Sequence, residues 1–448
     1  MSDGRVAAGA LRVFETRFDA RLLEETREPY AVVLRAGARL TPDALEIIEG
    51  TLLRFPETTL LYGDDTGTAR PAFSPVRLRS QDYLGGVVVL AADAAREALS
   101  RLSGALAAGL PTGDALVWLI ALQLAEQGAP GVAVPQPLTV PADDAAGVPA
   151  SADDARRVQE LLGANGVESS VSVAAGGVLD IRYPVGEAPL VSIVMPTRGG
   201  SGSVHGRERC FVVEAVRSIL EKSTYPRLEI VVVADADTPP EVEAELALIA
   251  GDRLRLIRWS APFNFAAKMN RGALEASGEY LLLLNDDVEV LSADWIERML
   301  GLALQKRVGL VGALLLFEDG TVQHGGHLYR RGEPTHAAIG VPRDDPGPGG
   351  SLLVDREVSG VTAACALLSA ERFREVGGFS ALLPSNYNDV DLCLKLGSRG
   401  LSVLWTPHAV LHHYESRSRV ARIVPYERQL LLRRWASRIQ VDPFWPER

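Results

Sequence analysis

The stretch that decides the fold is Tyr280–Val290, YLLLLNDDVEV. It opens with the apolar run Tyr280–Leu284, which has no polar alternation, as is typical of a strand covered on both faces of a sheet. The run stops at an acidic cluster, and a helix-like segment, Ser292–Leu304, follows. Because ligands of open α/β sheets bind outside the carboxyl ends of the strands, this cluster lies where a binding site is expected.

The acidic cluster consists of Asn285, Asp286, Asp287 and Glu289. Several carboxylates at one turn all ionise only when a cation or solvent screens their charges. Hard oxygen ligands of this kind suit Mg²⁺ or Mn²⁺, usually shared with the phosphates of a substrate. A solvated acidic turn before the N-terminus of a helix accounts for the same residues equally well, since acids are favourable there.

Composition narrows the class of protein. The 448 residues suffice for two or three domains, and a formal net charge of −11 argues against nucleic acid as the main partner. Cys210, Cys365 and Cys393 form no C-x-x-C pair, which indicates a reducing, cytoplasmic location. No apolar run approaches the ~20 residues that span a bilayer, so any contact with a membrane is expected to be peripheral.

Strands alternate with helix-like segments through the second half of the chain, and this order indicates a mostly parallel α/β sheet. Apolar runs predict strands at Leu228–Val233 and Leu254–Trp259, and a further strand begins near Pro189. Helices are expected at Phe211–Glu221 and Ala266–Ala276.

A connecting region precedes this part of the chain. Val140–Ala150 is rich in Pro, Ala and Asp, which is typical of a linker. Ser151–Leu162 then predicts a helix, with Ser151 and Asp153 available as caps. Val167–Val185 alternates around Ala-Ala-Gly-Gly, which predicts a hairpin.

An internal repeat relates the two halves of the chain. Tyr30–Leu45 aligns without gaps on Tyr280–Trp295, with Tyr30 opposite Tyr280. The acidic residues of the second copy, Asp286, Asp287 and Glu289, stand opposite Ala36, Gly37 and Arg39. We therefore predict an N-terminal copy without metal ligands, although two unrelated strand–turn–helix units would give the same short match.

From Pro189 to Arg419 the sequence resembles the family 2 glycosyltransferases of the GT-A fold. Within them it is most similar to the bacterial branch that builds cell-surface polysaccharides, with its rhamnosyltransferase-like and O-antigen enzymes. The resemblance rests on segments in conserved order: VSIVMPTR, EIVVVADAD, APFNFAAKMNRGALEASGEYLLLLNDDVEV, VQHGG, VTAACALLS, FREVGGF, NYNDVDLCLKL and LHHYESRSR. The first half resembles the leading domain of tandem members, as the remnant of a second GT-A unit.

The resemblance implies an α/β fold with four regions. Residues 1–140 are expected to form a degenerate, non-catalytic GT-A-like domain, and residues 141–188 a linker with a helix and a hairpin. Residues 189–420 would form the GT-A catalytic domain, which is Rossmann-like with a mostly parallel sheet. Residues 421–448 are expected to form a tail packed on that domain.

The resemblance also implies a set of metal ligands. Asn285-Asp286-Asp287 stands at the D-x-D position, so Asp287 is expected to hold a divalent cation, Mg²⁺ or Mn²⁺, on the donor diphosphate. Asp286 would assist or hold the ribose, and Glu289 would lie behind them. Asn285 removes one charge from the ligand set but can still bind ribose. His413 stands where some relatives supply a further ligand.

Asp389 is the general base that the resemblance implies, because Asn388-Asp389 stands at the E-D position. An inverting transfer needs one carboxylate beside the acceptor hydroxyl. Asp391 is left open between the acceptor side and a structural role in a helix. Acceptor or diphosphate contacts are expected from Asn388, His324 in the Gly-rich VQHGG, Arg417 and Arg419.

The nucleotide is expected at the ends of the first two strands of the catalytic domain. A base N–H would be accepted by Asp235 or Asp237, and Lys268 is a weaker candidate. The full set of expected nucleotide-sugar contacts is Pro196, Thr197, Arg198, Asp235, Asp237, Asn270, Arg271, Asn285 and Asp286.

These features predict an inverting, metal-dependent glycosyltransferase of cell-surface polysaccharide synthesis. Its partners would be a nucleotide-diphosphate sugar, a glycan or lipid-linked glycan acceptor, and other polysaccharide-assembly proteins or the inner face of the membrane. The alternative is a non-catalytic component that binds nucleotide sugar or glycan, which the Asn at the head of both acidic motifs favours. A nucleotidyltransferase would usually show a Gly-rich G-x-G-T-R loop, which VMPTRGG does not supply.

Overall fold

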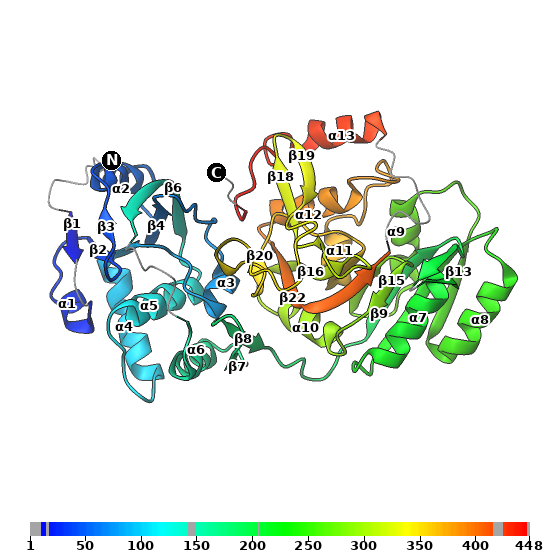
Figure 1. The fold of residues 1–448 in the computed structure, drawn as a ribbon, viewed down its shortest axis with the longest axis horizontal. Helices are drawn as coiled ribbons and strands as arrows, with labels where there is room; N and C mark the ends of the chain where they lie inside the picture. Colours follow the sequence, from blue (N-terminus) through cyan, green and yellow to red (C-terminus); the bar gives the residue numbers. More distant parts are fainter. Residues whose placement is uncertain (1–9, 15–17, 142–148, 205, 415–423, 446–448) are drawn as a thin grey trace. The chain divides into compact units, whose positions relative to one another are not determined.

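The computed structural model describes residues 10–14, 18–141, 149–204, 206–414 and 424–445. The chain divides into two compact units, which are described separately (Figure 1). The first unit comprises Met1–Arg182 with Pro443–Arg448, and the second comprises Tyr183–Asp442. Within the described residues, no helix combines the length and the apolarity needed to cross a membrane.

A ten-stranded sheet forms the centre of the second unit. Its main path runs β13–β12–β9–β14–β21–β16–β22–β15, with β17 beside β16 and β20 beside β22. These strands are β9 (Val191–Thr197), β12 (Leu228–Asp235), β13 (Leu254–Trp259), β14 (Tyr280–Leu284), β15 (Val288–Val290), β16 (Val308–Leu316), β17 (Val322–His324), β20 (Arg356–Glu357), β21 (Cys365–Ser369) and β22 (Ser402–His413).

The predicted α/β class is confirmed by this sheet. Strands β13, β12, β9 and β14 are mutually parallel, and β16 is parallel to β22. Strand β21 runs antiparallel between β14 and β16, and the short β15, β17 and β20 pair antiparallel at the edges. Strands β9, β12 and β14 are largely buried, as the unbroken apolar run of β14 predicted, while the edge strand β13 is partly exposed.

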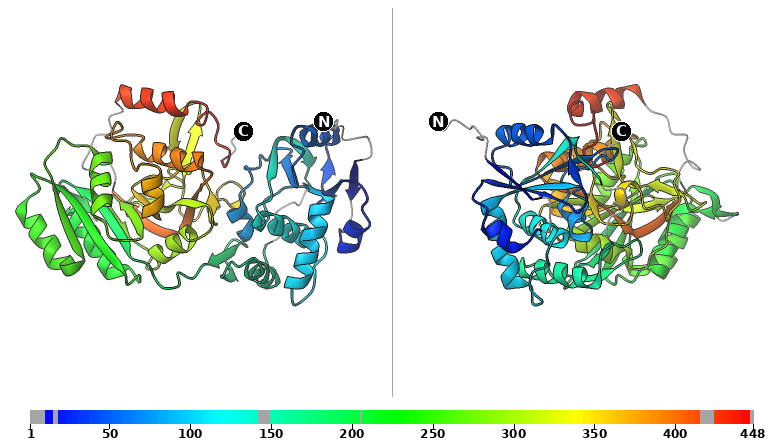
Figure 2. Two further views of the ribbon diagram at one scale, coloured as in Figure 1. Left: turned by 180° about the vertical axis from the view of Figure 1, so that it is seen from behind. Right: turned by 60° about the vertical axis from the view of Figure 1, so that its left-hand side comes forward.

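Helices join the parallel strands, because such strands cannot be linked by tight turns. Helix α7 (Phe211–Lys222) leads from β9 to β12, and α8 (Pro240–Ala250) leads on to β13. These two helices pack side by side (Figures 1 and 2). Helix α9 (Phe265–Glu275) carries the chain back to β14, and the right-handed crossover rule puts it on the opposite face.

Further elements complete the second unit. Helix α10 (Trp295–Ala303) begins later than the sequence predicts, because Asp294 before it has non-helical backbone angles, with φ of −93° and ψ of 21°. The hairpins β10 (Ser201–Val204) with β11 (Arg207–Cys210) and β18 (His327–Arg330) with β19 (Glu333–His336) were not predicted. The remaining helices are α11 (Ala370–Glu375), α12 (Asn388–Ser398) and α13 (Pro425–Trp435), with 3₁₀ turns at Gly251–Arg253 and Pro348–Gly350.

The first unit contains a six-stranded sheet in the order β1–β2–β5–β4–β6–β3. A core cluster between this sheet and α2 includes Val32, Ile48 and Leu61. The elements are β1 (Leu11–Phe14), α1 (Ala20–Glu24), β2 (Tyr30–Leu34), β3 (Arg39–Leu40), α2 (Ala44–Arg54), β4 (Leu60–Asp65), α3 (Pro75–Ser80), β5 (Val87–Ala91), α4 (Ala92–Ala105), α5 (Asp114–Glu126) and β6 (Gly131–Val140).

A helix and a hairpin follow β6, as the sequence predicts. Helix α6 (Ala152–Ala164) starts after Ser151, whose side chain accepts a hydrogen bond from Asp154 N in a capping box. The hairpin consists of β7 (Ser170–Val173) and β8 (Leu179–Arg182). Most of the predicted linker, residues 142–148, lies outside the described residues.

The sheet of the first unit has the same topology as six strands of the larger sheet in the second unit. The order β1–β2–β5–β4–β6–β3 matches β9–β14–β21–β16–β22–β15, and every neighbouring pair has the same relative direction in both. The parallel ladders even share an irregularity in register, after Gly63 in β4 and after Ala313 in β16. Since Gly63 and Ala313 keep the spacing of Tyr30 and Tyr280, the similarity extends well beyond the short sequence match.

Equivalent backbone hydrogen bonds support this correspondence. They lie between β2 and α2 in the first unit and between β14 and α10 in the second. Just after the strand, Arg35 N donates to Gly86 O at 2.9 Å, and Asn285 N donates to Ala364 O at 3.1 Å. Before the helix, Thr41 N donates to Leu138 O at 3.0 Å, and Leu291 N donates to Val410 O at 2.9 Å.

Candidate active site

Three strand ends of the second unit meet in one hydrogen-bonded cluster. Thr197, the last residue of β9, donates its hydroxyl to Asp286 Oδ2 at 2.6 Å, just beyond the end of β14. Lys268 Nζ donates to Thr197 O at 2.8 Å and to Asp235 Oδ1 at 2.7 Å, at the end of β12. The sequence therefore placed Thr197, Asp235 and Asp286 correctly at neighbouring strand ends, where ligands of α/β sheets bind.

Lys268 holds this cluster together from α9. Its side chain is fully buried, and burial lowers the pKa of its ammonium group, while Asp235 opposes that shift. A buried cation without its partners would be costly, so Lys268 fixes the positions of the loops after β9 and β12. The sequence ranked it as a weak candidate because nothing local shows that it reaches Thr197, 71 residues away.

Asp287 and His413 face each other across the pairing of β15 with β22. Val288 lies opposite His413 in that ladder, and Tyr414 N donates to Asp287 O at 2.9 Å. His413 Nε2 lies 3.2 Å from Asp287 Oδ1 and 3.1 Å from Asn285 Nδ2. The backbone thus brings together residues from the predicted D-x-D position and from the predicted histidine ligand.

Gln323 sets the tautomer of His413. Its amide nitrogen donates to His413 O at 3.2 Å, so its oxygen faces His413 Nδ1 at 2.7 Å. Nδ1 therefore carries the proton, and Nε2 presents its lone pair toward Asn285 and Asp287. The sequence analysis did not predict a role for Gln323. In the same VQHGG segment it predicted an acceptor or diphosphate contact for the neighbouring His324.

The donor set around Asp287 fits a divalent cation. Asp287 is 7% exposed, and its Oδ1 has no hydrogen-bond donor. A buried carboxylate oxygen without a donor is costly unless a cation satisfies it. Burial, followed by the charge of Asp287, raises the pKa of Asp286 to about 7, so the two acids cannot both ionise cheaply without added positive charge.

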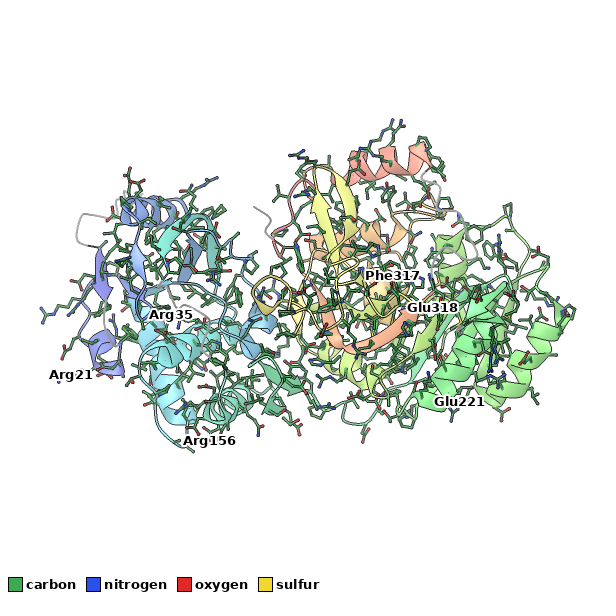
Figure 3. The ribbon with its side chains drawn as sticks, viewed as in Figure 1. Arg21, Arg35, Arg156, Glu221, Phe317 and Glu318 are labelled. Atoms are coloured by element: carbon green, nitrogen blue, oxygen red, sulfur yellow. The ribbon has the colours of Figure 1, made fainter. Side chains whose placement is uncertain are left out.

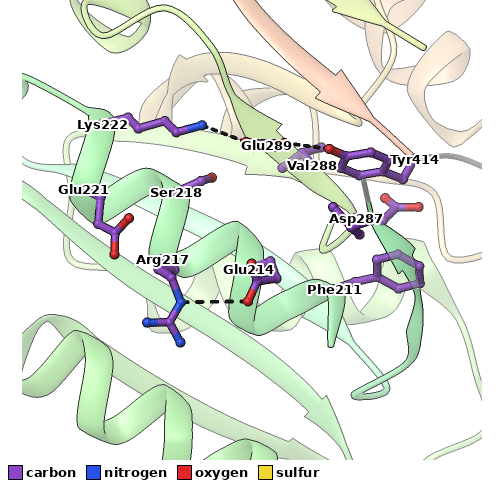
Figure 4. Close-up of a pocket in the computed structure, with 11 residues that line it drawn as sticks. Phe211, Glu214, Arg217, Ser218, Glu221, Lys222, Asp287, Val288, Glu289 and Tyr414 are labelled. Atoms are coloured by element: carbon purple, nitrogen blue, oxygen red, sulfur yellow. Dashed lines mark hydrogen bonds and ion pairs between the residues drawn. The ribbon is translucent and has the colours of Figure 1, made fainter. Parts of the chain in front are cut away.

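A pocket adjoins Asp287 on the side of α7 (Figure 4). Tyr414 donates its hydroxyl to Glu289 Oε2 at 2.6 Å, and Lys222 Nζ donates to Glu289 Oε1 at 2.7 Å. Glu289 is therefore held by two neighbours and orients Tyr414, whose ring packs with Val204 and Phe211.

Asp389 lies at the start of α12, after Tyr387, whose φ is 61°. Its Oδ2 accepts a long hydrogen bond of 3.4 Å from Ala363 N and lies 3.9 Å from His327 Nε2. Its side chain is 22% exposed, so it remains reachable from solvent. The adjacent Ala364 accepts the bond from Asn285 N, which places Asp389 close to the acidic cluster.

Asp391 has the structural role that the sequence left open. It is fully buried, and it accepts hydrogen bonds from Arg434 Nη1 at 3.0 Å and Trp435 Nε1 at 2.9 Å. Lys395 Nζ lies 3.3 Å from its other oxygen. Asp391 thereby attaches α13 to α12. The neighbouring Asn388 is also buried, with its amide directed to Leu383 O at 3.4 Å.

Of the remaining residues that were predicted to contact substrate, some are buried or bound to the backbone and others are exposed. Asn270 uses both ends of its amide on the backbone of Phe379, each at 2.9 Å, so it braces a loop. Arg271 pairs with Glu275 on the exposed side of α9. His324 is fully buried, Pro196 is buried within β9, and Arg198 and Asp237 lie exposed after their strands. Arg417 and Arg419 lie outside the described residues.

Residues 192–377 match the family model of glycosyl transferase family 2. Over these residues the match confirms the resemblance to family 2 glycosyltransferases that the sequence motifs predicted. The matched region includes the clustered strand ends, from β9 to the segment after β21.

Two curated relatives extend the similarity beyond this domain. The chain is 32% identical over 417 residues to the O-antigen biosynthesis protein RfbC of Myxococcus xanthus, covering 89% of this chain and 32% of RfbC. It is 35% identical over 273 residues to the uncharacterized protein y4gI of Sinorhizobium fredii (strain NBRC 101917 / NGR234), covering 58% of this chain and 29% of y4gI. The chain thus spans about a third of the length of these relatives.

Among solved structures, the chain is similar to GalNAc-T7 crystallised with UDP, GalNAc and Mn²⁺. The TM-score is 0.47 and the sequence identity 14%, over 58% of this chain and 50% of that chain.

Proposed function

We propose that the second unit is an inverting, cation-dependent glycosyltransferase that moves a sugar from a nucleotide-diphosphate donor to a glycan or lipid-linked acceptor. The observation that carries the proposal is the pair formed by Asp287 Oδ1 and His413 Nε2, 3.2 Å apart, in which Asp287 belongs to the region 192–377 that matches the model of glycosyl transferase family 2. The relative that acts in O-antigen biosynthesis supports a role in cell-surface polysaccharide synthesis.

Asp287 and His413, assisted by Asp286, would hold the cation, Mg²⁺ or Mn²⁺. When bound, the ion would stabilise the charge that develops on the departing diphosphate. Gln323 contributes by fixing the proton of His413 on Nδ1, so that Nε2 faces Asp287. Thr197 orients Asp286 through its hydroxyl.

Asp389 is the general base in this proposal. It is the acid at the acceptor side that keeps an exposed edge, whereas Asp391 is buried in ion pairs. Its Oδ1 accepts a hydrogen bond of 2.8 Å from Val390 N, whereas its Oδ2 accepts only the long bond of 3.4 Å from Ala363 N, so Oδ2 can still accept the proton of an acceptor hydroxyl. His327, 3.9 Å away, adds a polar neighbour to that edge.

The nucleotide would occupy the ends of β9 and β12. Thr197 and Asp235 are held there by Lys268, and Arg198 and Asp237 lie exposed beside them. We therefore assign donor contact to Arg198, Asp235 and Asp237, and a bracing role to Asn270.

We also propose that the first unit is a degenerate copy of the catalytic fold. The shared strand order, directions and register irregularity support a common origin. Arg35, labelled in Figure 3, stands at the place of Asn285. It pairs with Asp82 at 2.5 Å. Ala36 and Gly37 stand at the places of Asp286 and Asp287, so this unit offers no acid there.

The experiment that tests the function is a thermal-shift screen of UDP-, dTDP- and GDP-sugars with and without Mn²⁺. We expect one nucleotide class to raise the melting temperature only with the ion present. At 100 times the dissociation constant, ligand linkage adds about 2.7 kcal/mol to the free energy of unfolding. Sugar transfer to a glycan acceptor is then measured with the donor that binds.

Each outcome of this screen has a distinct meaning. Stabilisation together with sugar transfer supports the enzyme. Stabilisation with neither transfer to an acceptor nor hydrolysis of the donor supports the non-catalytic binding component instead. If no nucleotide sugar changes the melting temperature in the presence of Mn²⁺, the proposed donor site is wrong.

A further inference from the structure

Three histidines of the second unit converge outside the Asp287–His413 pair. His324 ends β17, His327 begins β18 and His336 ends β19. The β18–β19 ladder pairs His327 directly with His336, while Gly326, with φ of 100°, turns the chain sharply between His324 and His327. Because these elements fold onto one another, three side chains that span 13 positions of sequence share one small volume.

The rings of these histidines have the spacing of metal ligands. One ring nitrogen of each lies within 4.8 Å of a ring nitrogen of the other two. The ring centroids are 4.7, 5.3 and 5.7 Å apart, and the rings stand at 60° to 80° to one another. Imidazoles bound at 2.0–2.1 Å to one tetrahedral Zn²⁺ have centroids about 5 Å apart.

Burial favours the uncharged form of His324 and His327, two of the three histidines. His324 is fully buried and His327 is 4% exposed. Burial, together with the neighbouring histidines, lowers the pKa of His324 well below its usual value, and burial lowers the pKa of His327 to about 4. Neutral imidazoles are the form that binds transition metals, so no proton needs to be removed from a charged ring at neutral pH.

Hydrogen bonding leaves the cluster incompletely satisfied. His324 Nδ1 and His336 Nδ1 are 3.1 Å apart, a distance at which two lone pairs repel unless a proton or a cation lies between them. His336 Nδ1 also lies 3.2 Å from the carbonyl oxygen of Gln323, which can only accept a hydrogen bond and so requires a proton on the same nitrogen. His327 Nδ1 is buried without a hydrogen-bond partner.

One existing bond would have to change when an ion enters. Thr362 N donates to His324 Nε2 at 3.2 Å, which keeps the proton of His324 on Nδ1. Coordination through Nδ1 moves that proton to Nε2 and breaks the bond to Thr362. This bond is long, and Thr362 lies in an irregular segment, so the loss is small beside three new metal–nitrogen bonds.

We propose that His324, His327 and His336 form a second metal site, specific for a borderline divalent ion of the Zn²⁺ type rather than for Mg²⁺. Imidazole nitrogens favour such ions, while Mg²⁺ prefers oxygen. Asp389 Oδ2 lies 3.9 Å from His327 Nε2 and is the nearest candidate for a fourth ligand. Gln323 separates this site from His413, so two ions of different chemistry have separate ligands.

The site has a consequence that rests on the proposed function. If Asp389 is the general base, an ion held by the three histidines withdraws its carboxylate from the acceptor. Zn²⁺ is then an inhibitor that acts at the acceptor side and leaves the affinity for the donor unchanged.

The test uses the full chain, freed of metal with a chelator, and Co²⁺ alone as a spectroscopic probe. In the Asp287→Ala background the other site is removed, and we expect one equivalent of Co²⁺ with the intense visible absorption of a tetrahedral centre. Asp287→Ala with His336→Gln should lose this absorption. His408→Gln in the same background is the matched control, since His408 lies outside the cluster, and should keep it.

Melting temperatures measured in chelator show whether each variant is folded. If His336→Gln is not folded, His327→Asn replaces it in the same comparison. The proposal is overturned if the Asp287→Ala protein binds no Co²⁺, or if the histidine variants bind it as well as the control does. Because the readout is bound metal, it holds whether or not the chain transfers sugar, so failure here is separate from failure of the proposed function.

Discussion

At the scale of single residues, the proposed function makes Asp287 the residue that decides whether the cation binds. Its buried Oδ1 has no hydrogen-bond donor and faces His413 Nε2. We expect Asp287→Ala to abolish Mn²⁺-dependent donor binding, measured by calorimetry, with little change in melting temperature because an unsatisfied buried acid is removed. Asp252→Ala, at an exposed position on another loop, is the control. Unchanged donor binding by Asp287→Ala, or full turnover in excess chelator, would contradict the cation site.

Asp389 should affect turnover rather than binding. We expect Asp389→Asn to lower kcat by roughly 10²-fold or more while the dissociation constant of the donor stays the same, as for the loss of a general base. Steady-state kinetics and donor titrations measure the two quantities separately. A variant that loses donor affinity and keeps kcat would show that Asp389 binds the donor instead.

How much of the site the sequence could predict depends on the range of the contacts. Asp286, Asp287 and His413 were placed because motif position and strand ends are local properties. Gln323 and Lys268 were missed or ranked low, since their partners lie 90 and 71 residues away. Asn270 was predicted to contact the nucleotide, yet the nitrogen and the oxygen of its amide both bind the backbone of Phe379. Only the tertiary fold brings Phe379, 109 residues away, close to Asn270.

At the scale of elements, a buried acid of α12 binds side chains of α13, next to a hydrophobic cluster that includes Val390 and Leu431. Asp391 accepts bonds from Arg434 and Trp435 and lies beside Lys395. We expect Asp391→Asn to lower the free energy of unfolding by about 2 kcal/mol, because hydrogen bonds to a charged group are lost while the side-chain shape is kept. Urea unfolding measures this change, and the donor affinity of the folded variant should match that of the wild type. An equal stability with reduced turnover would return Asp391 to the acceptor site.

Strands and helices with a strong local pattern were predicted well. The apolar runs at β13 and β14 match the observed bounds. Helix α7 differs from the prediction by one residue at its C-terminal end, and α9 by one residue at each end. The antiparallel β21 and the two hairpins of the second unit were not foreseen. Their direction and pairing depend on which strands they meet, and that is a tertiary property rather than a property of the segment.

At the scale of the whole molecule, two similar sheets should provide one active centre. In the first unit Arg35, Ala36 and Gly37 replace the acidic cluster, and Arg35 is already paired with Asp82. We expect calorimetric titration with the donor and Mn²⁺ to give one site per chain, and Asp287→Ala to leave none. A stoichiometry of two, or a residual site in Asp287→Ala, would contradict the view that the first unit is inactive.

If the first unit is the degenerate copy proposed above, the backbone at Gly37 makes the loss of its active centre hard to reverse. Its φ of 77° lies in the left-handed region, where a side chain costs roughly 1–2 kcal/mol. A Gly37→Asp substitution would strain the turn. It would also put a carboxylate two residues from the ion-paired Arg35, without a histidine in the place that His413 has beside Asp287. On the proposed duplication, each such substitution is easier to acquire than to reverse. Selection for folding keeps the hydrogen-bonded sheet, while substitutions at its strand ends accumulate and remove the residues needed for catalysis.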